Sequence, residues 1–203
     1  DGAGYTFLTF DEGHASSAHA FIKVNGGEQH LVLGQMSCAQ AELLLGFVES
    51  QGIRLGIVEG PREATLTFAQ GWALTAGRFH HLQLNLGLYE LTHLKMVDLE
   101  GGRLYQATEA HRERLTEYIT GFCRDCFPEQ PMAQEMIEAR VTRFITQRRA
   151  HFWQTSDQEL VAMAAVVRES PNTASISWVY TAPSRRKRGY AARIVAALSQ
   201  AQL

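Results

Sequence analysis

The chain has 203 residues, of which 45% are hydrophobic, and a formal net charge of −2 at pH 7. This length is sufficient for one large domain or for two small ones. Because the net charge is close to zero, no overall field would gather nucleic acid or a membrane surface, so neither is an expected partner and any anion site must be local.

No apolar run approaches the roughly 20 residues that span a bilayer. The first residues also lack the basic and apolar regions of a signal peptide. A cytoplasmic protein is therefore expected.

The first half of the chain predicts alternating strands and helices. A hairpin is expected at residues 18–36, because two strand-like runs flank Asn25 and two glycines, which supply positive φ at low cost. The spacing of apolar residues then predicts a helix, a buried strand, a second helix and a long strand with leucine at every second position. These four elements are expected at residues 38–52, 53–60, 61–77 and 80–94.

A change in pattern before Gly101-Gly102 indicates a domain boundary, which we place between residues 97 and 98. Beyond it the sequence predicts a strand, two helices, three strands and a final helix. These elements are expected at residues 103–108, 109–127, 132–150, 151–154, 159–169, 173–183 and 189–203. This order predicts an α/β fold built on a mixed sheet flanked by helices.

A basic turn lies between the last predicted strand and the last predicted helix. Residues 185–192 read Arg-Arg-Lys-Arg-Gly-Tyr-Ala-Ala. The first turn of a helix leaves backbone N–H groups unpaired and carries the positive end of the helix dipole, so it can bind phosphate. Gly189 would allow close approach, and the arms of Arg185 to Arg188 could reach peripheral phosphates. The sequence therefore predicts a phosphate-binding loop, with an RNA contact as an alternative.

Metal and redox chemistry are not expected. Cys123 and Cys126 form a CxxC, but no second CxxC completes a zinc site, and three cysteines cannot form a disulfide framework. His80 and His81 would point to opposite faces of the predicted strand, so both cannot easily bind one ion.

The run from residue 181 to residue 191 resembles the signature of the GNAT superfamily of N-acetyltransferases. In that family a strand ending in V-x-P is followed by [Q/R]-x-x-G-x-[G/A]. Arg186, Gly189 and Ala191 occupy its three defining positions and Pro183 fits the proline, whereas Thr181 replaces the valine. The order of strand, turn and helix supports the resemblance, because the short motif alone occurs by chance in many chains.

The resemblance implies a GNAT-like mixed sheet flanked by helices, in two lobes. Residues 1–97 resemble the degenerate N-terminal lobe of two-lobed bacterial members, and residues 98–203 the domain that binds acetyl-CoA. GNAT domains continue beyond the helix that follows the loop. The resemblance therefore implies that the C-terminal part of the second lobe is missing from this sequence, with completion of the site by another chain as the alternative.

The resemblance also implies an acyltransferase that moves the acetyl group of acetyl-CoA to a small-molecule or peptide amine by direct attack. The strand end would bind the pantetheine arm and the loop the pyrophosphate. The implied cofactor-binding residues are Val179, Tyr180, Thr181, Arg186, Lys187, Arg188, Gly189, Tyr190, Ala191 and Ala192.

The catalytic acid and base stay unassigned. A base is needed because a lysine-like amine is mostly protonated at pH 7. Glu109, His151 and Glu169 are the nearest candidates in sequence, and Tyr180 acting through an ordered water is another. A non-catalytic GNAT-like binding or regulatory module is the alternative function, and a homodimer is left open.

Overall fold

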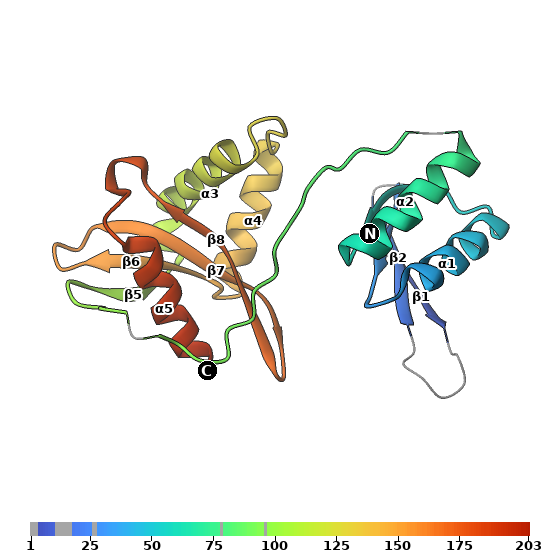
Figure 1. Cartoon of the computed structure of the whole chain (residues 1–203). Helices are drawn as coiled ribbons and strands as arrows, with labels where there is room; N and C mark the ends of the chain where they lie inside the picture. The colour runs from blue at the N-terminus through green and yellow to red at the C-terminus, as the bar shows by residue number, and fades with distance from the viewer. Residues whose placement is uncertain (1–3, 11–17, 26–27, 78, 96) are drawn as a thin grey trace. The chain divides into compact units, whose positions relative to one another are not determined.

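The computed structural model describes residues 4–10, 18–25, 28–77, 79–95 and 97–203. The chain divides into two compact units, Asp1–Leu88 and Tyr89–Leu203. Each unit contains one four-stranded sheet with its own helices (Figure 1). In the described part of the chain, no helix has the length and hydropathy that crossing a membrane requires.

The N-terminal unit has a mixed sheet in the order β1-β2-β3-β4, in which only the β3–β4 pair is parallel. Its elements are β1 (Tyr5–Phe10), β2 (Ala18–Asn25), β3 (Glu28–Leu33), α1 (Cys38–Ser50), β4 (Leu55–Glu59) and α2 (Arg62–Ala76). The hairpin of β2 and β3, both helices and the strand between them were predicted, and the structure confirms them. Strand β1 was not predicted.

Local chemistry explains where these helices begin and end. The hydroxyl of Ser37 accepts a hydrogen bond from the Gln40 amide, and the Gln40 side chain accepts one from the Ser37 amide, which caps the start of α1. Gly77 ends α2 in a left-handed conformation, with φ 60°. The two helices cover one face of the sheet, where Leu31, Leu44 and other apolar side chains form the core.

The long strand predicted at residues 80–94 is wrong. The described residues from 79 to 95 contain neither helix nor strand. The alternating leucines are exposed, with 66%, 53%, 71% and 97% of the surface of Leu82, Leu84, Leu86 and Leu88 accessible. Alternation shows that a segment suits a sheet face, but a strand also requires a neighbouring strand, and these residues have none. The boundary expected between residues 97 and 98 follows this segment and stays a prediction.

The C-terminal unit follows the predicted order of elements, and its α/β class is confirmed. Its elements are β5 (Gly102–Gln106), the 3₁₀ turn η1 (Glu109–His111), α3 (Arg112–Cys126), α4 (Gln134–Thr146), β6 (Ala150–Thr155), β7 (Leu160–Ser170), β8 (Thr173–Thr181), the 3₁₀ turn η2 (Pro183–Arg185) and α5 (Tyr190–Gln202). The described sheet has the order β5-β6-β7-β8 and is antiparallel throughout.

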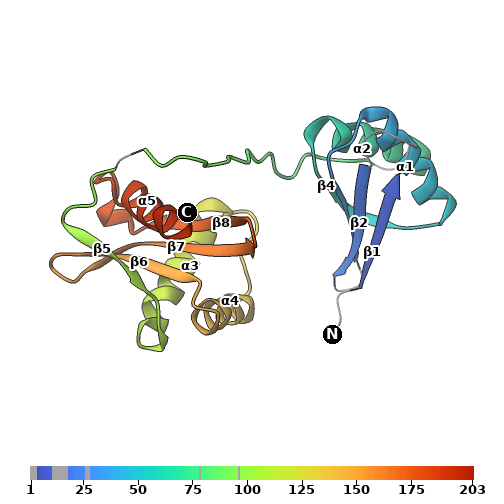
Figure 2. The same ribbon diagram turned by 90° about the horizontal axis from the view of Figure 1, so that it is seen from below.

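Helices α3 and α4 cover one face of this sheet and α5 covers the other (Figure 2). Side chains alternate between two cores, because successive residues of a strand point to opposite faces. Phe152 and Tyr180 pack on the α3–α4 side, whereas Trp153 and Val179 pack on the α5 side. The end of β8 therefore contacts both layers just before the chain enters the loop that precedes α5.

Candidate functional site

Strand β8 carries a bulge at the position where the sequence predicts contact with the pantetheine arm. Met163 pairs with Tyr180 and Ala165 with Ser177, so one residue of β7 faces both Trp178 and Val179. Trp178 has φ 57°, in a left-handed region that a bulky residue rarely adopts. A bulge removes one residue from the ladder and leaves its backbone groups unpaired. The other edge of β8 has no strand partner among the described residues.

The loop after β8 exposes a row of backbone amides. Lys187 and Gly189 both have left-handed conformations, with φ 63° and 78°, and such turns direct successive N–H groups into a concave anion site. Gly189 caps α5 without a side-chain hydrogen bond. The helical ladder begins where the Arg193 amide donates to the Gly189 carbonyl at 3.0 Å, so the amides of residues 190–192 precede it. A Cβ at Gly189 would meet no atom within 4 Å, which leaves the approach open.

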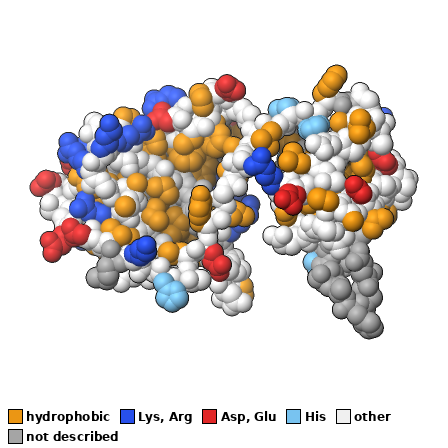
Figure 3. All heavy atoms as spheres, viewed as in Figure 1, with side chains coloured by type: hydrophobic (Ala, Val, Ile, Leu, Met, Phe, Trp, Pro, Cys, Tyr) orange, Lys and Arg blue, Asp and Glu red, His pale blue; other side chains and the backbone are white. Residues whose placement is uncertain are grey.

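The basic residues of this loop do not all have the same role. The guanidinium of Arg185 lies 2.7 Å from the carboxylate of Glu159. Lys187 and Arg188 are exposed and have no ion pair in the part of the chain that the structure describes. Figure 3 shows Lys and Arg side chains gathered at one corner of this unit, beside an area of hydrophobic side chains. The free cationic arms of the loop are therefore Lys187 and Arg188.

Arg186, the first residue of the motif, is bound to helix α3. Its Nη2 lies 2.5 Å from Oδ2 of Asp125, and its Nε donates to the Thr181 carbonyl at 3.1 Å. This contact, with a second from Arg124, lowers the pKa of the Asp125 carboxyl. Arg186 stays a predicted cofactor residue, but in this arrangement its guanidinium ties the start of the loop to the end of α3.

The phenol of Tyr180 belongs to the same network. Its hydroxyl donates to Oδ2 of Asp125 at 3.3 Å, and its ring lies under the Arg186 guanidinium, 5.3 Å from it. Burial, followed by the charge of Asp125, raises the pKa of Tyr180. The ring occupies the space above Gly121, where a Cβ would lie 2.5 Å from the Tyr180 oxygen. Tyr180 therefore points into the α3 side of the unit.

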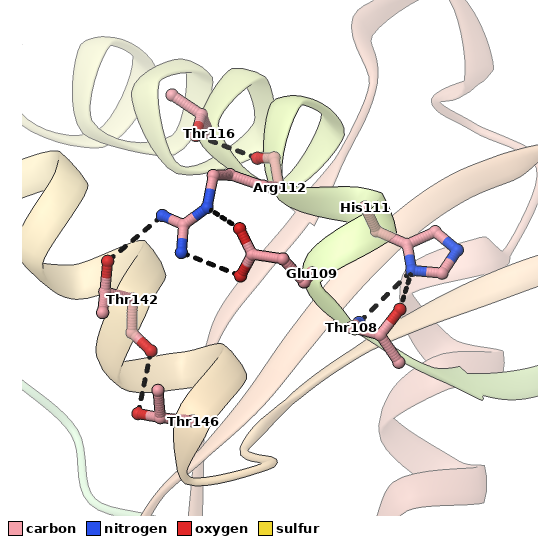
Figure 4. Close-up of polar contacts among 7 residues, drawn as sticks. All are labelled: Thr108, Glu109, His111, Arg112, Thr116, Thr142 and Thr146. Carbon is pink, nitrogen blue, oxygen red and sulfur yellow. Dashed lines mark hydrogen bonds and ion pairs between the residues drawn. The ribbon is translucent and has the colours of Figure 1, made fainter.

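The carboxylate of Glu109 forms an ion pair with Arg112. The Arg112 guanidinium contacts both carboxylate oxygens of Glu109 and donates to Oγ1 of Thr142 at 3.1 Å (Figure 4). This hydrogen bonding lowers the pKa of Glu109. A carboxylate with a lowered pKa is a weaker proton acceptor, and here it joins η1 to α3 and, through Arg112, to α4.

The other two candidate bases lie on separate strands. His151 has a buried Nδ1 with no hydrogen-bond partner among the described residues, and burial lowers the pKa of its imidazole. It is therefore neutral at pH 7. Glu169 is exposed, with a carboxylate oxygen 3.8 Å from the Arg149 guanidinium. Among the described residues, no hydrogen bond or ion pair joins any of the three candidates to Trp178, so the base stays unassigned.

The predicted cofactor residues follow one another along the chain through three elements. Residues 179–181 end β8, residues 186–189 form the loop and residues 190–192 form the first turn of α5. Sequence reasoning missed Asp125 and Gly121, which fix Arg186 and Tyr180. The RxxGxA motif gives no signal for them, because they lie about 60 residues earlier on another element. No cluster of three metal-ligating side chains occurs among the described residues.

Comparison with known proteins shows a similarity for most of the C-terminal unit. Residues 112–201 match the family described as the acetyltransferase (GNAT) family. A crystal structure from Pyrococcus horikoshii, described as "A Putative Acetyltransferase", matches at 16% sequence identity and a TM-score of 0.39. The match covers 61% of this chain and 38% of that chain, so it spans well under half of the archaeal protein. No curated protein matches the sequence.

Proposed function

We propose that this chain, whose residues 112–201 match the acetyltransferase (GNAT) family, is an acetyl-CoA-dependent acyltransferase acting on an amine. The observation that carries the proposal is the combination of a bulged strand end and a loop of unpaired amides at the start of α5. The two features follow one another along the chain, as a long ligand with a phosphate at one end requires.

The residues present fit coenzyme A. The amides of residues 190–192 and the left-handed loop suit a pyrophosphate, since a helix N-terminus stabilises anions. Lys187 and Arg188 supply free positive charge for a further phosphate. The unpaired backbone of β8 at Trp178 suits the amides of the pantetheine arm. The ligand would supply a thioester, which an amine can attack with departure of the thiol.

The chain's own contribution to the reaction is positioning and electrostatics. A backbone N–H freed by the bulge can donate to the carbonyl oxygen on which negative charge develops. The packing of the Trp178 indole against Phe122 and Phe144 maintains the strained φ, which keeps this donor in place before the ligand binds. Holding the amine and the thioester close together in the orientation for attack would provide most of the rate acceleration.

The test is calorimetric titration with three ligands that differ in phosphate content. Coenzyme A should bind tighter than 3′-dephospho-coenzyme A, and pantetheine should bind weakly. Replacing Lys187 and Arg188 with Ala should weaken coenzyme A by roughly 10- to 1000-fold, since contacts to charged groups contribute about 1.5–3 kcal/mol each and less when exposed. Pantetheine should respond hardly at all. Lys23→Ala with Arg168→Ala removes the same two charge types elsewhere and should change nothing.

Equal losses for coenzyme A and pantetheine would show that the loop acts through folding, and the proposal would fail. Acetyl transfer is measured separately, by release of free thiol from acetyl-CoA with a panel of amines. Coenzyme A binding without transfer to any amine would favour the alternative, a non-catalytic GNAT-like regulatory module.

A further inference from the structure

An aromatic cluster surrounds the Trp178 side chain on the α3–α4 side of the sheet. The ring centroid of Trp178 lies 4.7 Å from that of Phe122 and 5.9 Å from that of Phe144. Phe127, just after α3, lies 6.1 Å from Phe122. These four rings, the Trp178 cluster, come from α3, the residue that follows it, α4 and the bulge of β8. They fix the indole of Trp178, whose backbone lies in the bulge of β8.

Arg140 of α4 stacks on this cluster. Its guanidinium carbon lies 5.2 Å from the Trp178 ring centroid and 5.8 Å from that of Phe144. The side chain is half-buried. Burial, followed by the charge of Arg143, lowers the pKa of Arg140. The stacking therefore holds a partly desolvated guanidinium at a defined place. The aromatic contacts offset only part of the free-energy cost of removing this charge from water.

No carboxylate pairs with Arg140 among the described residues. The half-buried arginines Arg149, Arg185 and Arg193 each contact a Glu or Asp. The Cys123 thiol is the group whose negative form could offset the charge of Arg140. Burial raises the pKa of this thiol, so it is neutral at pH 7. A half-buried guanidinium with an unused fork of donors suits a carboxylate from outside the chain.

Arg140 is linked to the proposed reaction site through Trp178. The guanidinium contacts the indole, and the same residue's backbone forms the bulge that the proposed function assigns to the thioester. An acceptor that bound Arg140 through an anionic group would lie against the indole. Its amine would then be directed towards the bulge.

From this geometry we propose that the acceptor is an amine that carries a carboxylate, and that Arg140 binds this carboxylate and so determines specificity. The inference rests on the proposed function, and it names the substrate class of that site. Trp178 supplies the apolar face on which the carbon skeleton between amine and carboxylate packs. In the transfer step the amine nitrogen forms the new bond to the acetyl carbon, the carbon–sulfur bond breaks, and the amine proton leaves to solvent or base while the thiolate departs.

The probe is a panel of free amino acids, each paired with its own carboxamide, which has no carboxylate. Binding to the full chain loaded with coenzyme A is measured by calorimetry, and transfer is measured by thiol release. Charge-assisted hydrogen bonds to a carboxylate correspond to a preference of about 10- to 150-fold for the acid over the carboxamide. Arg140→Gln should reduce this preference to near unity. Comparing the ratio between variants cancels the different amine pKa values of acid and carboxamide.

Arg143→Gln is the matched control, since it removes a neighbouring arginine of the same helix whose Nε contacts Gln147. It should leave most of the preference in place, because it removes only the charge of Arg143 and not the guanidinium that stacks on Trp178. Arg140→Lys keeps the charge without the planar fork and should retain only part of the preference. Arg140→Gln should also leave the melting temperature nearly unchanged, because it removes a cation that has no acid partner.

The two proposals fail in different ways. If the wild-type chain binds acids no better than carboxamides, or if Arg140→Gln keeps the preference, the assignment of Arg140 is overturned whether or not transfer occurs. If the preference depends on Arg140 but no amine is acetylated, the carboxylate site stands and the enzymatic function fails.

Discussion

Gly189 offers the sharpest test of the loop, because two substitutions of nearly equal size differ there only in charge. Its φ of 78° is strained for most side chains, but Asn and Asp tolerate the left-handed region better than others. A Cβ at this position meets no atom within 4 Å, so either side chain would extend into the open space before α5. Gly189→Asp and Gly189→Asn should therefore lose similar, small amounts of stability.

Their affinities for coenzyme A should differ strongly. A carboxylate about 5 Å from one phosphate charge, at an effective dielectric constant of about 20, is repelled by about 3 kcal/mol. Salt screening at this exposed position reduces the effect to about 2–3 kcal/mol. Gly189→Asp should thus bind coenzyme A about 30- to 150-fold more weakly than Gly189→Asn. Calorimetry with both variants, each checked by thermal melting, gives the comparison, and equal affinities would refute the placement of the pyrophosphate.

Three further outcomes are expected. Gly121→Ala should destabilise the C-terminal unit by about 1–3 kcal/mol, because its Cβ would overlap the Tyr180 oxygen. Gly46→Ala in α1 has open space around it and should stabilise the first unit by up to about 1 kcal/mol. Denaturant unfolding that ranked the two variants the other way would contradict the packing described. Burial lowers the pKa of His151 below 6.5. Its contribution to the free energy of unfolding is therefore complete above about pH 6.5 and declines as the pH falls below that value. A lowered pKa in NMR titration and a shallower decline of stability with pH in His151→Gln would support this, and a pKa above 6.5 would not. A fragment of residues 1–97 should bind no coenzyme A in calorimetry, since no GxG or RxxGx[G/A] loop precedes a helix there. Saturable binding would overturn the assignment of the cofactor to the second unit.

The elements predicted from the sequence were those whose signals are local. The helical spacing of apolar residues within residues 38–52 and the stop at Gly77 mark helices of the first unit with signals that need no distant partner. Strand β1 was missed although its aromatic and threonine residues favour strands, because six residues without a clear apolar alternation give only a weak signal. The prediction of a strand at residues 80–94 was wrong for the opposite reason. The alternation of leucines was clear, but the segment has no neighbouring strand with which to pair among the described residues.

The candidate site likewise has parts that local sequence signals predicted and parts that they did not. The amides of residues 190–192 follow directly from a basic glycine turn before a helix, so sequence reasoning found them. The left-handed conformation of Trp178 could not be predicted, because tryptophan rarely adopts it and a bulge depends on the register with β7. The pairing of Arg186 with Asp125 joins residues 61 positions apart and arises only from tertiary packing.

The exposed leucine-rich segment between α2 and β5 has a practical consequence. Proteases cut extended, solvent-accessible backbone that makes no ladder hydrogen bonds, and Leu82, Leu84, Leu86 and Leu88 provide apolar side chains that chymotrypsin-like enzymes accept. Brief digestion should therefore cut first within residues 79–95 and release two fragments, each with its own sheet and core. Such a nick would provide both units from a single preparation of the intact chain, without recloning either of them.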